Sequence, residues 1–143
     1  ERLNKPENWP YRTVFLISLR NKYQLKMKQH PDKMFASDLK NIKTLKDFDD
    51  IYTSKAHGFK DAYDYYQKNS SNQFLPNIKI PVFILNAKND SFLNPDCFPF
   101  DIAKSSKYIF LETPLHGGHV GFHLSNDTYY SEKRTVVFLK NIK

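Results

Sequence analysis

Apolar residues in the first half of this sequence recur at helical spacing. One set follows Pro10 at four-residue steps: Tyr11, Phe15, Leu19 and Tyr23. Residues four apart share one face of a helix, and proline is tolerated in a first helical turn, so the set predicts an amphipathic helix beginning near Pro10. A buried strand is the alternative, because residues 14–17 are continuously apolar. Residues 1–10 are expected to form an entry loop.

Two further helices are predicted in the first half. The pair His30-Pro31 breaks the first helix, because a residue before proline resists helical backbone angles. The next apolar set is spaced mostly by threes: Leu39, Ile42, Leu45, Phe48 and Ile51. It predicts a second helix over residues 37–52. A third set consists of Phe59, Ala62, Tyr63 and Tyr66. It predicts a helix that ends at the polar residues 69–72.

The pattern becomes strand-like after residue 79. Residues 80–85 are apolar throughout and partly β-branched, which is typical of a strand buried on both faces of a parallel sheet. We predict strands over residues 80–87 and 107–112, with Pro81 at the beginning of the first. About twenty residues separate them, including a short helix over 101–106, so we expect a crossover connection and parallel pairing. A closing helix over 129–142, capped by Asn126 or Asp127, follows. The fold class is α/β.

Composition narrows the class of protein. The 143 residues are the size of one domain, and 40% of them are hydrophobic. The net charge is +7, but the basic residues are mostly lysines spread along the whole chain, which argues against a nucleic-acid groove. Cys97 is the only cysteine, so a reducing, cytoplasmic location fits better than secretion. No apolar run is long enough for a membrane span, and no signal-peptide pattern is present.

Residues 116–122, here called the histidine loop, carry the strongest chemical signal. They place His116, His119 and three glycines directly after the second predicted strand. A histidine can transfer a proton near neutral pH, so this loop is a candidate catalytic site. The alternative interpretation is a plain turn with two surface histidines. Asp90 lies just beyond the first strand, 29 residues before His119. Functional groups gather at the carboxyl ends of parallel strands, so we expect Asp90 to hold the imidazole of His119.

The chain resembles the C-terminal part of the YheT-like family of α/β-hydrolases. The matching stretches, in family order, are Thr44-Leu45-Lys46-Asp47-Phe48-Asp49-Asp50, His57-Gly58-Phe59, Asp64-Tyr65-Tyr66, Ser70-Ser71, Ile80-Pro81, Asn89-Asp90-Ser91-Phe92 and the histidine loop. The resemblance implies an esterase-type serine hydrolase with Asp90 as triad acid and His119 as triad base. The family usually has Asp-Asp-Pro-Phe where this chain has residues 89–92, so the acid is retained and the proline is lost.

The same resemblance implies that the chain is a fragment. No Gly-x-Ser-x-Gly nucleophile motif and no His-Gly-Gly-Gly oxyanion loop occur in it, and both would precede Glu1. Residues 1–75 are then a helical cap-like segment, and 76–143 are the C-terminal part of the α/β-hydrolase core. No metal or organic cofactor is implied. The expected partners are an apolar ester substrate and, at the exposed sheet edge, either the N-terminal part of the protein or a second copy.

Three rival interpretations remain open. His116, His119 and His123 could bind a metal with Asp90, although zinc-binding His-x-x-His pairs usually stand on a helix and the glycines oppose one here. Cys97 could act as the nucleophile, although a small buried or half-buried thiol is the plainer interpretation. A binding module that lost catalysis is the third. Structural roles are expected for four other residues: His57 starting a helix, His116 shaping its loop, and Asp49 and Asp50 on a helix surface or as caps.

Overall fold

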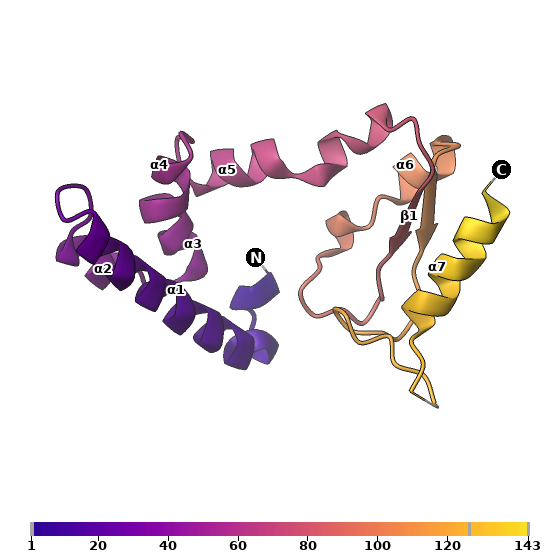
Figure 1. Ribbon diagram of the computed structural model, residues 1–143, viewed down its shortest axis with the longest axis horizontal. Helices are drawn as coiled ribbons and strands as arrows, with labels where there is room; N and C mark the ends of the chain where they lie inside the picture. Colours follow the sequence, from indigo (N-terminus) through magenta and orange to yellow (C-terminus); the bar gives the residue numbers. More distant parts are fainter. Residues whose placement is uncertain (1, 126, 143) are drawn as a thin grey trace. The chain divides into compact units, whose positions relative to one another are not determined.

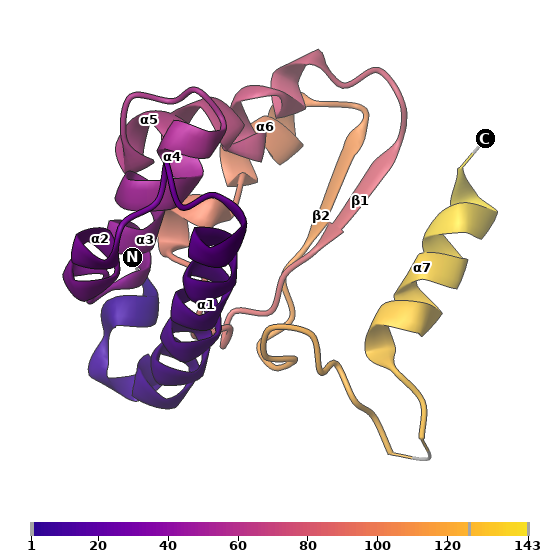
Figure 2. The same cartoon turned by 60° about the vertical axis from the view of Figure 1, so that its left-hand side comes forward.

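The computed structural model describes residues 2–125 and 127–142. These residues form two compact units, a helical one over Leu3–Ser70 and a second one that comprises Arg2 and residues 71–142. Figure 1 labels the α-helices and β1, and Figure 2 also labels β2. The functional division into a cap-like segment over 1–75 and a hydrolase core over 76–143 stays a prediction.

The helical unit begins with α1, Trp9–Gln29, which confirms the first predicted helix and excludes the strand alternative. Pro10 lies in its first turn, where the missing amide hydrogen has no helical partner to lose. The helix ends at His30, immediately before Pro31. The prediction of an entry loop over residues 1–10 was only partly right, because this segment contains two short 3-10 turns, Arg2–Asn4 and Pro6–Asn8.

The single helix predicted over residues 37–52 was wrong. The chain forms four short pieces instead: α2 (Ala36–Asn41), α3 (Leu45–Phe48), a π-helical turn (Asp49–Thr53) and α4 (Ser54–Ala56). The break follows α2 because Ile42 adopts extended angles and Thr44 begins a new helix. The Thr44 side chain accepts from the Asp47 amide, and the Asp47 side chain accepts from the Thr44 amide, forming a capping box.

The predicted third helix is α5, Ala62–Asn69, which starts three residues later than its apolar stripe and ends where expected. The Asp61 carboxylate caps it by accepting a hydrogen bond from the Asp64 amide at 2.8 Å. The core of the helical unit consists of the buried residues Tyr23, Met34, Ile42 and Phe48. Arg20 secures α1 to the end of α2, since its guanidinium donates to the carbonyls of Leu39 and Ile42 at 2.8 and 2.6 Å.

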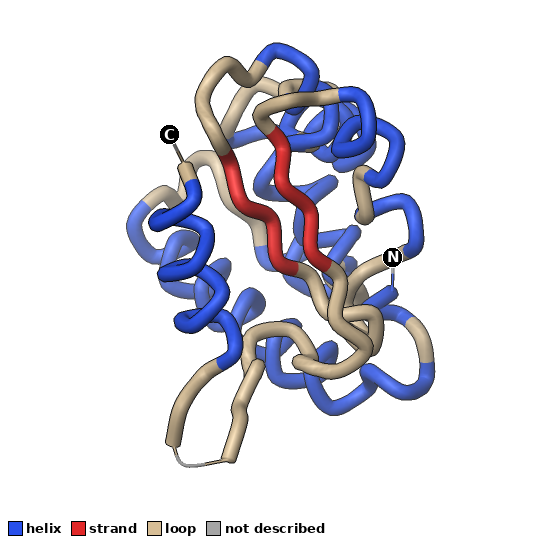
Figure 3. The backbone as a smooth tube through the Cα atoms, turned by 90° about the vertical axis from the view of Figure 1, so that its right-hand side faces the viewer, coloured by secondary structure: helices blue, strands red, loops and turns tan. Residues whose placement is uncertain are grey.

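The second unit contains a two-stranded parallel sheet, β1 (Val82–Leu85) and β2 (Ile109–Glu112), with Val82 opposite Ile109. The strands lie side by side in Figure 3, and their pairing is parallel. The predicted strands 80–87 and 107–112 are therefore present, but shorter. The predicted short helix over 101–106 is α6 (Phe100–Ser105), which lies in the connection. It packs against β2 (Figure 2).

The closing helix is α7, Tyr130–Asn141. Phe138 of this helix stacks on Phe83 of β1 at 5.2 Å between ring centroids and meets Phe110 of β2 edge-on at 5.3 Å. The predicted cap was wrong for Asp127, because Tyr129 holds the N-cap position and no side chain caps the helix. The other predicted cap, Asn126, lies outside the described residues.

β1 is not buried on both faces as predicted. All four of its residues are half-buried, because the described residues supply a single neighbouring strand. Within residues 2–125 and 127–142, no helix combines the length and the apolar character needed to cross a membrane.

Candidate functional site

The two loops that follow β1 and β2 run together beyond the ends of the strands. Strand pairing is extended by the Asn86 amide, which donates to the Glu112 carbonyl at 3.1 Å. The Lys88 amide then donates to the Pro114 carbonyl at 2.8 Å. Since carboxyl ends of parallel strands meet at one sheet edge, the acid loop (residues 86–92) and the histidine loop are held next to each other.

Asp90 and His119 form the centre of this edge. His119 Nδ1 lies 2.8 Å from Asp90 Oδ2, so the contact expected from the sequence is present. The Asp90 side chain is 3% exposed and that of His119 is 51% exposed. An ionised carboxylate can only accept a hydrogen bond, so Nδ1 carries the proton and Nε2 is the basic nitrogen. No described residue bonds to Nε2, and such a nitrogen can accept a proton from a nucleophile.

A second hydrogen bond fixes the orientation of the Asp90 carboxylate. Its other oxygen, Oδ1, accepts from the Phe92 amide at 2.8 Å and closes a turn around Ser91. The loop therefore keeps a defined shape with serine at the position of the family's proline. The Phe92 ring also contacts the imidazole of His119, with 4.7 Å between the ring centroids. Sequence reasoning did not assign this packing role to Phe92.

Asn89 is a residue of the site that the sequence analysis did not single out. Its side-chain oxygen accepts a hydrogen bond from the Gly118 amide at 2.9 Å. Gly118 has φ +59°, a left-handed conformation that glycine adopts without strain. The signal that could have found Asn89 is its sequence separation from Gly118, which equals the separation of Asp90 from His119.

The histidine loop folds back on itself around Gly117. The Gly117 carbonyl accepts from the Phe122 amide at 2.9 Å, and Phe122 is buried with φ +46°. A Cβ atom on Gly117 would lie 2.5 Å from the Phe122 ring, closer than packed carbon atoms allow. Glycine at this position therefore lets the Phe122 ring close the loop.

Beyond the loop, α7 is attached to the end of β2 through Glu112. The Glu112 carboxylate accepts from Arg134 Nε at 3.0 and 2.8 Å and from the Tyr130 hydroxyl. The hydrogen bond to Glu112, together with burial and the negative charge of Glu112, raises the pKa of Tyr130. These contacts join the residues on both sides of the histidine loop and so restrict its ends.

The remaining histidines do not contact Asp90. His116 is exposed. His123 lies against the Tyr129 ring, with Nε2 3.8 Å from a carboxylate oxygen of Asp127. His57 was expected to start a helix, but it ends α4 instead. Among the described residues, no group of three or more histidine, cysteine, aspartate or glutamate side chains is placed to hold a metal ion.

Three further predicted residues have clear positions. Cys97 is exposed at the end of a 3-10 turn, Pro95–Cys97, so the expectation of a buried or half-buried thiol was wrong. Asp50 is a capping group, as expected, because its Oδ1 accepts from the Ala62 amide at the start of α5 at 2.7 Å. Asp49 accepts from the Tyr66 hydroxyl at 2.5 Å.

Comparison with known proteins finds relatives that are named as an esterase, a phospholipase and a lipase. The chain is 36% identical over 86 residues to the Escherichia coli protein named "Putative esterase YheT", an alignment that covers 60% of this chain and 25% of the relative. It is 32% identical over 126 residues to phospholipase ABHD3 of Bos taurus, covering 85% and 30%. It is 35% identical over 98 residues to monoacylglycerol lipase of Saccharomyces cerevisiae, covering 67% and 22%. No protein-family model matches, and no solved structure matches.

These relatives and the parallel strands with helical connections define part of an α/β-hydrolase fold. The chain belongs to the YheT-like family of α/β-hydrolases. It spans less than a third of the length of each of the relatives named above.

Proposed function

We propose that these residues belong to a serine hydrolase that cleaves carboxylic esters, with Asp90 as the acid and His119 as the base of its triad. The observation that carries the proposal is the 2.8 Å contact between His119 Nδ1 and the buried Asp90 carboxylate, which leaves Nε2 on an exposed edge. The relatives support the reaction class, since their names describe an esterase, a phospholipase and a lipase.

The chemistry assigned to each residue follows from this geometry. A serine outside this chain attacks the ester carbonyl while His119 Nε2 takes its proton, and the imidazolium then gives a proton to the departing alcohol. The Asp90 carboxylate holds the proton-bearing Nδ1 in place and stabilises the positive charge on the ring. Water then attacks the acyl-enzyme while His119 Nε2 takes its proton, and the imidazolium returns a proton to the departing serine. No metal or organic cofactor enters the reaction.

The proposed substrate is an ester with an apolar acyl or alcohol part. The support is the set of aromatic residues in the helical segment, of which Tyr11, Phe15, Tyr63 and Tyr66 are exposed. The cytoplasm is the proposed location. The free edge of β1 is proposed to be occupied by the N-terminal part of the same protein or by a second copy of the chain.

The test is made on the full-length protein. A fluorophosphonate probe, which forms a bond to activated serines, is expected to label one serine in a Gly-x-Ser-x-Gly turn upstream of residue 1. The same preparation is expected to hydrolyse p-nitrophenyl esters. A natural start codon immediately upstream of residue 1, with no labelled serine, would support a binding module and contradict the proposal.

The isolated chain is expected to lack ester hydrolysis above background, because it has neither nucleophile nor oxyanion hole. Cys97 is the control, since its exposed thiol is a nucleophile in its own right. Turnover of p-nitrophenyl acetate by the isolated chain that disappears in Cys97→Ala would favour the cysteine interpretation over the serine mechanism.

A further inference from the structure

A pocket of about 460 Å³ opens on the helical unit, and none of the residues assigned above to catalysis lines it. Its apolar wall consists of Tyr23, Met34, Phe35, Ile51, Tyr52 and Ala56. Its basic side chains are Lys26, His30, Lys33 and Lys55. Ligand pockets usually measure roughly 300–1,000 Å³, so this one has room for a small molecule.

Four residues of the apolar wall, Tyr23, Met34, Ile51 and Tyr52, belong to the packed core of the unit, so this part of the wall is preformed. Tyr23 and Met34 are buried core residues, and Tyr52 packs edge-on against Tyr23 with ring centroids 6.0 Å apart. Burial and the hydrogen bond to Asp38 raise the pKa of the Tyr23 hydroxyl, which stays neutral and directed at Asp38. A hydrocarbon chain on this wall would replace water in contact with fixed apolar side chains.

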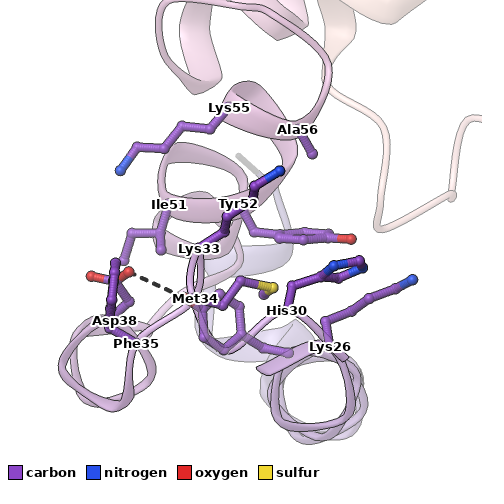
Figure 4. A pocket seen from close by; sticks show the side chains of 11 residues that line it. Lys26, His30, Lys33, Met34, Phe35, Asp38, Ile51, Tyr52, Lys55 and Ala56 are labelled. Carbon is purple, nitrogen blue, oxygen red and sulfur yellow. Dashed lines mark hydrogen bonds between the residues drawn. The ribbon is translucent and has the colours of Figure 1, made fainter. Parts of the chain in front are cut away.

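The polar part of the pocket has a strong excess of positive charge. Asp38 is the single acidic residue among the lining residues, and its carboxylate accepts from the Tyr23 hydroxyl at 3.1 Å. Lys26, Lys33 and Lys55 form no ion pair with any residue that the structure describes. Figure 4 shows the ends of Lys26, His30 and the Tyr52 ring on one side of the pocket, with Lys55 and Asp38 on the opposite side.

The lysines are not needed to satisfy the end of α1. The Lys26 carbonyl already accepts from the His30 amide at 2.9 Å, and the His30 carbonyl accepts from the Met34 amide at 3.1 Å. Like charges gathered over an apolar wall repel one another, and a bound anion would remove that repulsion. The ammonium groups are thus available as donors to a ligand.

We propose that this pocket binds a single-chain amphiphile with an anionic head group, such as a fatty-acid carboxylate or a monoalkyl phosphate. The head group meets Lys26, Lys33 and the His30 ring, and the alkyl chain lies along Met34, Ile51 and Tyr52. The charge excess selects the sign of the head group, and the apolar wall favours a ligand with a tail over an inorganic anion. The proposal is independent of the proposed ester hydrolysis, because it uses none of its residues.

Calorimetric titration of the full-length protein with laurate, below the concentration at which laurate forms micelles, tests the proposal. Saturable binding is expected, with octanoate weaker because fewer methylene groups are buried. Lys26→Gln combined with Lys33→Gln should weaken laurate binding about tenfold or more, since two charged donors are lost. The matched control is Lys22→Gln with Lys40→Gln, which removes one lysine of α1 and one of α2 that do not line the pocket.

The other probes separate the possible sources of binding. Dodecyl phosphate binding more tightly than laurate would identify a phosphate head group, and the reverse would identify a carboxylate. Dodecyltrimethylammonium has the same tail with a positive head, so equal binding of this probe would show non-specific apolar association and overturn the proposal. Absence of saturable laurate binding, or equal weakening in the control variant, would overturn it as well.

Discussion

The Asn89 side chain accepts a hydrogen bond from the Gly118 amide at 2.9 Å, one residue away from the contact between Asp90 and His119 at 2.8 Å. The two contacts join the acid loop and the histidine loop at consecutive positions. A single contact would leave the imidazole free to pivot about it, whereas two adjacent contacts fix both the position and the direction of the loop. We therefore propose that Asn89 positions His119.

Replacing Asn89 tests this relationship in the full-length protein. Asn89→Leu removes the acceptor and is expected to lower kcat for p-nitrophenyl esters by about 10- to 100-fold with little change in KM, because catalytic groups lose alignment. Asn89→Asp keeps an acceptor oxygen and restores the residue usual in the family, so it should retain most of kcat. A general loss of folding would lower both variants alike. Unchanged kcat in Asn89→Leu would show that the bond has no positioning role.

The two histidines of the loop provide a matched pair for the catalytic assignment. His119→Ala is expected to lower kcat about a thousandfold or more, because a triad without its base loses most of its rate enhancement. His116→Ala should cost far less, since His116 is exposed and lies outside the contact with Asp90. Steady-state kinetics of both variants decide the matter. Similar losses in the two variants would argue against His119 as the base.

Gly117 is expected to be intolerant of any side chain. Gly117→Ala places a Cβ atom 2.5 Å from the Phe122 ring, and such overpacking costs roughly 1–3 kcal/mol of folding free energy. Gly58→Ala is the control, because Gly58 has φ +75° but no atom near its would-be Cβ, so it tests backbone strain alone. Urea unfolding, monitored by NMR signals of each unit, measures the change in unfolding free energy caused by each substitution. An unperturbed second unit in Gly117→Ala would contradict the close packing.

A pH-dependent contribution to stability is expected from Asp50 in the helical unit. The hydrogen bond from Lys46, supported by the one from the Ala62 amide, outweighs burial and lowers the pKa of Asp50. A lowered folded-state pKa stabilises the protein above the unfolded value of about 4, and the contribution is lost as pH falls through the folded-state pKa. Asp50→Ala should therefore cost about 1 kcal/mol at neutral pH and progressively less in acid.

Asp50→Asn is the matched variant, because its amide oxygen can still accept from the Ala62 amide while the pair with Lys46 is lost. It should fall between the wild type and Asp50→Ala at neutral pH. Chemical unfolding of the three proteins at several pH values measures the differences. A cost for Asp50→Ala that does not change with pH would show that the carboxylate charge contributes nothing.

The contact between Asp90 and His119 could be predicted because it follows from topology. Two apolar strands joined by a crossover bring their carboxyl ends together, whatever the exact strand lengths. The end of α2 was missed because apolar spacing outweighed a local signal, the capping box that begins at Thr44. The short length of β1 was not predictable from its own residues, since strand ends depend on the neighbours available for pairing.

The contacts of Glu112 with Tyr130 and Arg134 could not be predicted from the sequence, for a different reason. Their residues are 18 and 22 positions apart, and they meet only because Phe138 packs α7 against the sheet. No periodicity in the sequence encodes that encounter. The Asn89 contact has the same sequence separation as the contact of Asp90 with His119, but it also depends on the left-handed conformation of Gly118.

The free edge of β1 leads to the final prediction. Val82 and Asn86 direct their amides to β2, so the alternate amides of Phe83 and Leu85 face the opposite side, where no described strand pairs with them. An apolar strand with such an edge pairs readily with another chain. We expect the isolated chain to sediment as a dimer or larger, with the amides of Phe83 and Leu85 protected from hydrogen exchange. In the full-length protein an internal strand should protect the same amides in a monomer. A monomeric isolated chain in which Ile84 is protected while Phe83 and Leu85 exchange freely would show that the edge is bare and the prediction wrong.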